Sequence, residues 1–255
     1  MKIVILTHFD PASVMLGHRD VLRAGGDECY VAIVKPYKPR HFDADYIEGQ
    51  KGTKAQLQYH VDTADIIQFC PGIGHGTGDW AATDQIAAVI PRNDFEDFGL
   101  DIPEDYEIPR VHYLHGSRFT WANRGLYKTA YSGNNLCTST IDYASELGLE
   151  YLPPMVATVG HSAVLRRDID PLIISHTPTD TGNCNTKDIK ALCNKKGYVL
   201  NFKTMVSHKD ALVSKAQSNV GFDHLRGAFS VNTLENCAIG LAPVCGLKVD
   251  YLERL

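Results

Sequence analysis

The stretch "KIVILTHFDPASVMLGHRDVLRAGGDECYVAIV", residues 2–34, changes its pattern twice. It opens with "KIVILTHF", a nearly continuous apolar run typical of a strand buried in a parallel sheet. Apolar residues then recur at helical spacing, at Val14, Leu16, Val21 and Leu22. A Gly-Gly pair ends that helix pattern, and "CYVAIV" follows as a second strand. The order predicts a β-α-β unit, and therefore an α/β fold that binds ligands at the carboxyl ends of parallel strands.

The same alternation continues along the chain. Further strands are predicted at "DIIQFC", "RVHYLHG" and "NNLCTST". The double proline of "LEYLPPMV" interrupts regular structure, and strands and helices then alternate again from "PLIISHTPTD" to "APVCG". We predict two Rossmann-like domains, residues 1–155 and 156–255, with the boundary near residues 153–159.

Length and composition describe an ordinary globular protein. The chain has 255 residues, of which 44% are hydrophobic, enough for a full core. The first apolar run is too short for a signal peptide, and no stretch approaches the roughly 20 apolar residues of a membrane span, so we expect a cytoplasmic protein. Seven cysteines are spread without Cys-x-x-Cys pairs or zinc-finger spacing. We expect reduced, mostly buried thiols and no metal centre.

Charge is distributed unevenly between the two predicted domains. Residues 1–155 hold 13 Lys and Arg against 21 Asp and Glu, a balance of −8, whereas residues 156–255 hold 12 against 9, a balance of +3. The acidic excess is concentrated in "NDFEDFGLDIPEDYE", which we interpret as a solvated loop. The second domain is therefore the better host for an anionic ligand.

Residues 227–246, "GAFSVNTLENCAIGLAPVCG", combine a short polar loop with a predicted helix and strand. Backbone amides at the start of a helix, together with the helix dipole, can hold a diphosphate without a metal ion. Ser230, Asn232 and Thr233 could add hydrogen-bond donors there, or could only cap the helix. Glu235 could accept hydrogen bonds from ligand hydroxyls, or could only be a favourable charge near the helix start.

Several of these segments resemble the glycosyltransferases of the GT-B fold, specifically the retaining group-1 type. In the first half the resemblance rests on "FDPASVMLGHRDVLRAGGDECYVAI", "HYLHGSR" and "YLPPMV", and in the second half it begins with "IISHTPTD". The most specific match is "NVGFDHLRGAFSVNTLENCAIGLAPVCG". Its matching positions, in the family's order and spacing, are Asp223, Gly227, Leu234, Glu235, Gly240, Pro243 and Val244.

The resemblance implies transfer of a sugar from a nucleotide-diphosphate sugar, expected to be a UDP-sugar, to a hydroxyl acceptor. It implies retention of configuration and neither a metal ion nor a cofactor, with Glu235 binding the ribose hydroxyls. The residues expected around the donor are Glu235, Ser230, Asn232, Thr233, Phe229, Gly227, Asp223, Thr177, Lys187 and Arg226, with Lys203 as a further cation for the diphosphate. The first domain is expected to supply His115 and Arg118 for catalysis and His8, Ser13 and His75 on the acceptor side.

Two positions depart from the family pattern. Group-1 enzymes carry a second Glu where this chain has Gly227, and the family's Lys in the preceding segment is replaced by Asn185, with Lys187 two residues later. A non-catalytic nucleotide-binding scaffold or partner subunit of the same fold is therefore the alternative. The short chain also resembles compact bacteriophage-encoded members, some of which modify hydroxymethylated DNA bases in the host cytoplasm. The acceptor can thus be a saccharide, a small molecule or such a base.

Overall fold

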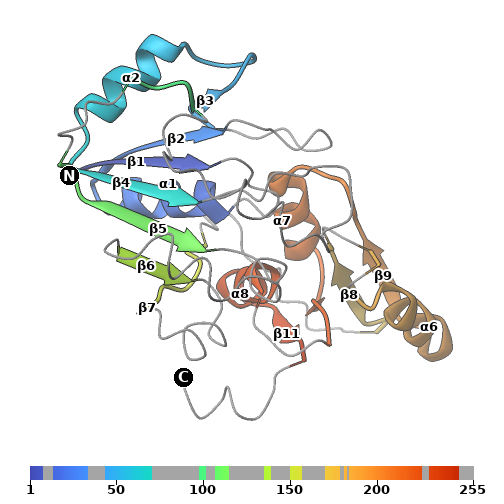
Figure 1. Cartoon of the computed structure of the whole chain (residues 1–255). Helices are drawn as coiled ribbons and strands as arrows, with labels where there is room; N and C mark the ends of the chain where they lie inside the picture. Colours follow the sequence, from blue (N-terminus) through green and yellow to red (C-terminus); the bar gives the residue numbers. More distant parts are fainter. Residues whose placement is uncertain are drawn as a thin grey trace, which may run out of the picture. The chain divides into compact units, whose positions relative to one another are not determined.

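The computed structural model describes residues 1–7, 14–33, 44–70, 98–101, 107–114, 135–138, 150–156, 170–178, 181–182, 184–225 and 230–246. These residues form two compact units. Unit 1 contains nearly all described residues up to Pro153, and unit 2 contains those from Pro154 onward. Each unit has its own parallel sheet (Figure 1).

Within the described residues, the sheet of unit 1 has seven strands in the order β3-β2-β1-β4-β5-β6-β7. All neighbouring pairs are parallel. The strands are β1 (Lys2–Thr7), β2 (Glu28–Ile33), β3 (Tyr46–Ile47), β4 (Ile66–Cys70), β5 (Arg110–Leu114), β6 (Asn135–Thr138) and β7 (Glu150–Tyr151). This order is that of a Rossmann sheet, and it reverses between β1 and β4, whose last residues Thr7 and Cys70 are register partners.

Two helices of unit 1 are described. Helix α1 (Val14–Ala24) connects β1 to β2, as its apolar spacing predicts. Helix α2 (Lys54–Asp62) begins with a capping box, in which Thr53 and Gln56 each satisfy the other's backbone N–H. One face of α2 packs on the sheet. The resulting core consists of Val4, Leu6, Ala32, Tyr46, Leu57, Val61, Ala64, Ile67, Phe69, Phe98 and Leu100.

The described residues of unit 2 form a four-stranded parallel sheet in the order β11-β10-β8-β9. Its strands are β8 (Ile173–His176), β9 (Val199–Phe202), β10 (Val220–Phe222) and β11 (Ala242–Val244). The helices between them are α6 (Thr186–Lys196), α7 (His208–Ala216) and α8 (Val231–Ala238). The strand order reverses between β8 and β10, so the crevice where such sheets bind ligands lies at the carboxyl ends of these two strands.

The α/β fold with two parallel sheets that the sequence predicts is confirmed. The strands β3 and β7 and helix α2 were not predicted. Within the described part of the chain, no helix has the length and apolar character needed to cross a membrane.

Candidate functional site

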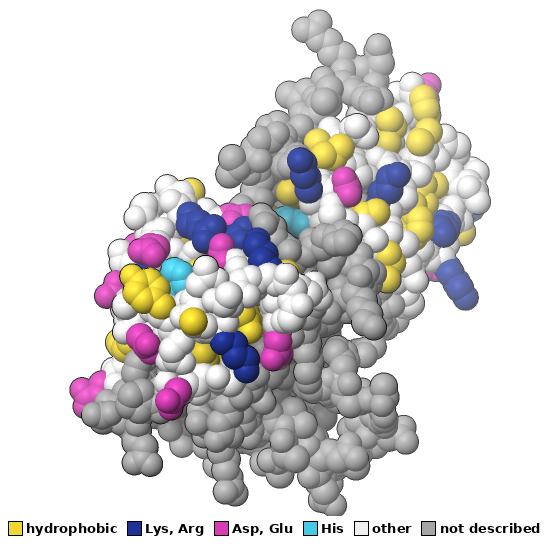
Figure 2. Space-filling view, turned by 90° about the horizontal axis from the view of Figure 1, so that it is seen from above, with side chains coloured by type: hydrophobic (Ala, Val, Ile, Leu, Met, Phe, Trp, Pro, Cys, Tyr) yellow, Lys and Arg dark blue, Asp and Glu magenta, His cyan; other side chains and the backbone are white. Residues whose placement is uncertain are grey.

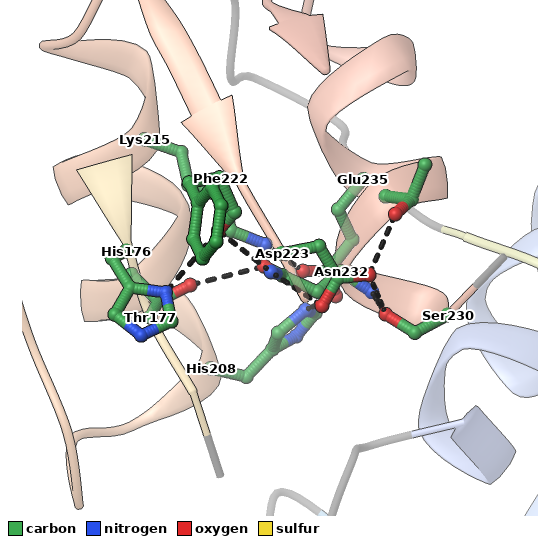
Figure 3. A network of polar contacts seen from close by, with 10 residues as sticks. His176, Thr177, His208, Lys215, Phe222, Asp223, Ser230, Asn232 and Glu235 are labelled. Atoms are coloured by element: carbon green, nitrogen blue, oxygen red, sulfur yellow. Dashed lines mark hydrogen bonds and ion pairs between the residues drawn. The ribbon is translucent and has the colours of Figure 1, made fainter. Parts of the chain in front are cut away.

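Polar side chains gather where the strand order of unit 2 reverses. Thr177 directly follows β8, Asp223 directly follows β10, and the first turn of α8 begins at Val231 after its N-cap Ser230. All three segments meet through hydrogen bonds, which Figure 3 shows from close by. The candidate site is thus built within unit 2 alone.

The carboxylate of Asp223 is the centre of this first network. It is buried, and it accepts hydrogen bonds from Thr233 Oγ1 at 2.6 Å, from Asn232 Nδ2 at 3.2 Å and from the Ser230 hydroxyl. The Ser230 Oγ in turn accepts from the backbone N–H of Asn232 at 3.1 Å, which caps α8. A negative charge at this helix end is favourable because it faces the positive pole of the helix dipole. The side-chain donors of the first turn are therefore directed at Asp223.

Two more contacts tie β8 to its neighbours. The Thr177 hydroxyl donates to Asn232 Oδ1 at 3.1 Å. The ring of His176 is fully buried, with Nδ1 at 3.3 Å from the Phe222 carbonyl and Nε2 at 2.9 Å from Thr186 Oγ1. A carbonyl can only accept, so Nδ1 carries the hydrogen and Nε2 accepts from the Thr186 hydroxyl. Burial lowers the pKa of His176, which favours the neutral ring.

Glu235 forms the second network, between α7 and α8. Its Oε1 atom accepts from His208 Nε2 at 2.7 Å, and its Oε2 atom pairs with the ammonium of Lys215. His208 and Lys215 are seven residues apart, two turns of α7, so both side chains lie on the same face of that helix. In Figure 3 the ring of His208 and the carboxylate of Glu235 point toward each other beside Asn232.

The charge of Glu235 is set by its partners. Burial alone would raise the pKa of this carboxyl, but the Lys215 ammonium and the His208 hydrogen bond outweigh it and hold the pKa at about 2. Glu235 is therefore ionised at neutral pH. The side chain of Lys215 is only 2% exposed, a degree of burial that lysine shows only when it is paired.

Close packing of α8 on β10 requires a glycine. A Cβ atom on Gly221 would lie only 2.2 Å from the side chain of Asn236. Asn236 is buried, and its side-chain oxygen and nitrogen have no hydrogen-bond partner among the described residues. Gly221 thus lets the helix that carries Asn232, Thr233 and Glu235 approach the sheet closely.

The structure brings together six of the residues that the sequence predicts for the donor. Thr177, Asp223, Ser230, Asn232, Thr233 and Glu235 all belong to the two networks. Lys187 is exposed in the first turn of α6, and Lys203 is exposed just after β9. His8, Ser13, His75, His115, Arg118, Arg226, Gly227 and Phe229 lie outside the described residues. The functional roles of all these residues stay predictions.

Sequence reasoning missed His208 and Lys215. Their spacing was a usable signal, because residues seven apart share a helix face and "SHKDALVSK" begins with Ser207 as an N-cap. A lysine on the same side as apolar residues needs an anion nearby, and Glu235, which the family resemblance assigns to the ribose hydroxyls, is that anion.

Comparisons with known proteins give a fold but no family by sequence. No protein-family model matches the chain, and no curated protein matches it. A solved alpha-glucosyltransferase in complex with UDP and a 13-mer DNA containing an HMU base has a similar structure, with a TM-score of 0.52 and 11% identity over 95% of this chain and 79% of that chain. A second alpha-glucosyltransferase complex, with UDP and a 13-mer DNA containing a central A:G mismatch, gives a TM-score of 0.53 and 11% identity over 95% and 78%. The fold is that of the GT-B glycosyltransferases.

Proposed function

We propose that the chain is a glycosyltransferase that moves a sugar from a nucleotide-diphosphate sugar to a hydroxyl acceptor. The observation that carries this proposal is the similarity of 95% of the chain to an alpha-glucosyltransferase that binds UDP. The polar networks of unit 2 support it, because they stand at the carboxyl ends of the two strands where a nucleotide binds in sheets of this type.

The donor, a UDP-sugar, binds to unit 2 in this proposal. Its ribose lies beside the pair His208 and Glu235, and its diphosphate faces the exposed Lys187 and Lys203. The side-chain donors at the start of α8 are already directed at Asp223. We therefore assign the neutralisation of the departing diphosphate to the two lysines. Stabilising the leaving diphosphate with fixed positive charge would supply much of the rate acceleration. We further propose retention of configuration and no need for a metal ion.

The proposed acceptor is a hydroxymethylated DNA base, because DNA is the second ligand of both similar structures. The distribution of charged side chains bears on how strongly DNA binding would depend on salt. On the face shown in Figure 2, the Lys and Arg side chains of the described residues are interspersed with Asp and Glu instead of forming one basic area. Binding to DNA through many phosphates depends on Lys and Arg, and the chain carries a formal net charge of −5, so we expect a modest dependence on salt.

A transfer assay tests the proposal. The protein is incubated with labelled UDP-glucose and either a duplex that contains hydroxymethylated pyrimidines or the same duplex with unmodified bases. Label on the modified duplex alone supports the proposal, and unchanged transfer in the presence of a chelator supports a metal-independent site. If only an added saccharide becomes labelled, the acceptor is a saccharide and not a DNA base. UDP binding without transfer or hydrolysis would instead support the non-catalytic scaffold.

A further inference from the structure

Glu235 reaches solvent much less than its histidine partner does. Its side chain is 7% exposed, whereas that of His208 is 28% exposed. The Lys215 ammonium holds the second carboxylate oxygen from inside the unit. Of these two side chains, His208 is therefore the more accessible to a ligand that arrives from solvent.

The hydrogen bond to Glu235 also fixes which nitrogen of His208 is available. The ionised carboxylate can only accept, so Nε2 carries the hydrogen that it donates at 2.7 Å. In the neutral ring Nδ1 is then an acceptor, and it makes no hydrogen bond within the described part of the chain. A carboxylate behind one nitrogen fixes the orientation of the ring and makes the other nitrogen a better acceptor, as it does for histidines that bind metals.

We propose that His208 is the residue that accepts a hydrogen bond from a ribose hydroxyl of the donor nucleotide, and that Glu235 and Lys215 are positioning residues that hold the ring. This inference rests on the proposed function and deepens its donor site. It changes the role assigned to Glu235, from a direct ligand of the ribose to a residue that acts through His208.

Direct contact between Glu235 and the ribose is the competing arrangement. A carboxylate has about four acceptor positions, of which two are used by His208 and Lys215. The Glu235 side chain is only 7% exposed, which leaves a ribose little access to the other two. The arrangement that we propose uses the more exposed ring of His208 instead.

The test compares the binding of UDP and of 2′,3′-dideoxy-UDP, which lacks both ribose hydroxyls, by titration calorimetry. The wild type is expected to bind UDP about five- to tenfold more tightly than the dideoxy compound, the range for one net hydrogen bond. His208→Ala is expected to remove that preference by weakening UDP binding alone. Lys209→Ala, a change of the exposed neighbouring residue on α7, is the matched control and should keep the preference.

A double-mutant cycle then separates the two roles. Because Glu235 acts through His208, Glu235→Gln and His208→Ala should each lower the affinity for UDP, and the double variant should bind no more weakly than His208→Ala. Additive losses would overturn the inference. If Glu235→Gln does not fold, as judged by circular dichroism, the His208→Ala comparison decides alone.

Failure of the inference and failure of the proposed function give different results. If the wild type binds UDP but His208→Ala keeps the full preference for UDP, only the inference is wrong. If the wild type itself does not bind UDP, the donor site and the inference both fail. If the wild type binds both nucleotides equally, the ribose hydroxyls are not contacted and the inference is wrong.

Discussion

Lys215 on α7 and Glu235 on α8 form an ion pair almost completely shielded from water. Each charge is tolerated there only because the other is present, since removing a charge from water costs several kcal/mol. The pair therefore joins the two helices that flank the proposed ribose position. We therefore expect changes at either residue to affect the proposed donor site as well as stability.

Removing one partner of this ion pair should destabilise the protein more than replacing both partners. Lys215→Met leaves a buried carboxylate with His208 as its remaining partner, and we expect the free energy of unfolding to fall by about 3 kcal/mol. The double variant Lys215→Met/Glu235→Leu should be closer to the wild type, because apolar groups of similar size replace both charges. Urea denaturation of the wild type, of Lys215→Met, of Glu235→Leu and of the double variant measures the four free energies of unfolding. A double variant as unstable as the sum of its two single changes would contradict the expectation.

Low pH should reduce the stability of the protein because it protonates Glu235. The pKa of this carboxyl falls from an ordinary 4.5 to about 2 on folding, so the stability it contributes is complete above about pH 4.5 and is lost as the pH falls toward 2. At about 1.36 kcal/mol per pKa unit, the loss is about 3 kcal/mol. We therefore expect the unfolding free energy to decline more steeply between pH 4.5 and 2.5 in the wild type than in Glu235→Gln. Equal slopes would show that Glu235 is not held ionised as described.

The contact between Gly221 and Asn236 makes a third prediction. Gly221→Ala forces the new methyl group into the buried amide, and overpacking of this kind typically costs about 1–3 kcal/mol. Combining it with Asn236→Ala provides the missing space, so the double variant should be more stable than Gly221→Ala alone. The melting temperatures of the four proteins of this cycle check the expectation. If the double variant is no more stable than Gly221→Ala, the close approach of α8 to β10 does not explain the destabilisation.

Reactivity toward a thiol reagent should be confined largely to one cysteine. All seven cysteines are free, and only Cys237 on α8 is exposed. Burial raises the pKa of Cys29 to about 12 and that of Cys137 to about 11, which suppresses the reactive thiolate. We expect one fast-reacting thiol in the native protein, absent in Cys237→Ser and retained in Cys29→Ser. Fast labelling of several thiols at neutral pH would contradict this assignment.

Long, regular elements are predicted well from the sequence because their buried apolar residues recur with the period of a helix or form a continuous run in a buried strand. The β-α-β start of unit 1 and each strand and helix of unit 2 were predicted from apolar runs and spacing. The strands β3 and β7 have two residues each, too few to show a period. Helix α2 was missed although Thr53 and Gln56 form a recognisable capping box.

Six of the residues that form the two polar networks of unit 2 were named from the sequence, but their side-chain contacts with one another were not predicted, and His208 and Lys215 were missed. Ser230, Asn232 and Thr233 were expected either to bind phosphate or to cap α8, and Ser230 does cap it. That all three are directed at Asp223 depends on how α8 packs against the end of β10, which no local pattern encodes. The same holds for Glu235, whose partners come from α7, a separate helix.

The order of the strands has a consequence for how the protein is made. In unit 2, β8 comes first in the chain and lies inside the sheet; β9 and β10 then pair with β8, and β11 pairs with β10. In unit 1, each described strand after β1 likewise pairs with a strand that precedes it in the chain. Each new strand emerging from the ribosome thus finds its template already synthesised, so both sheets can grow outward from their first strand in the direction of translation.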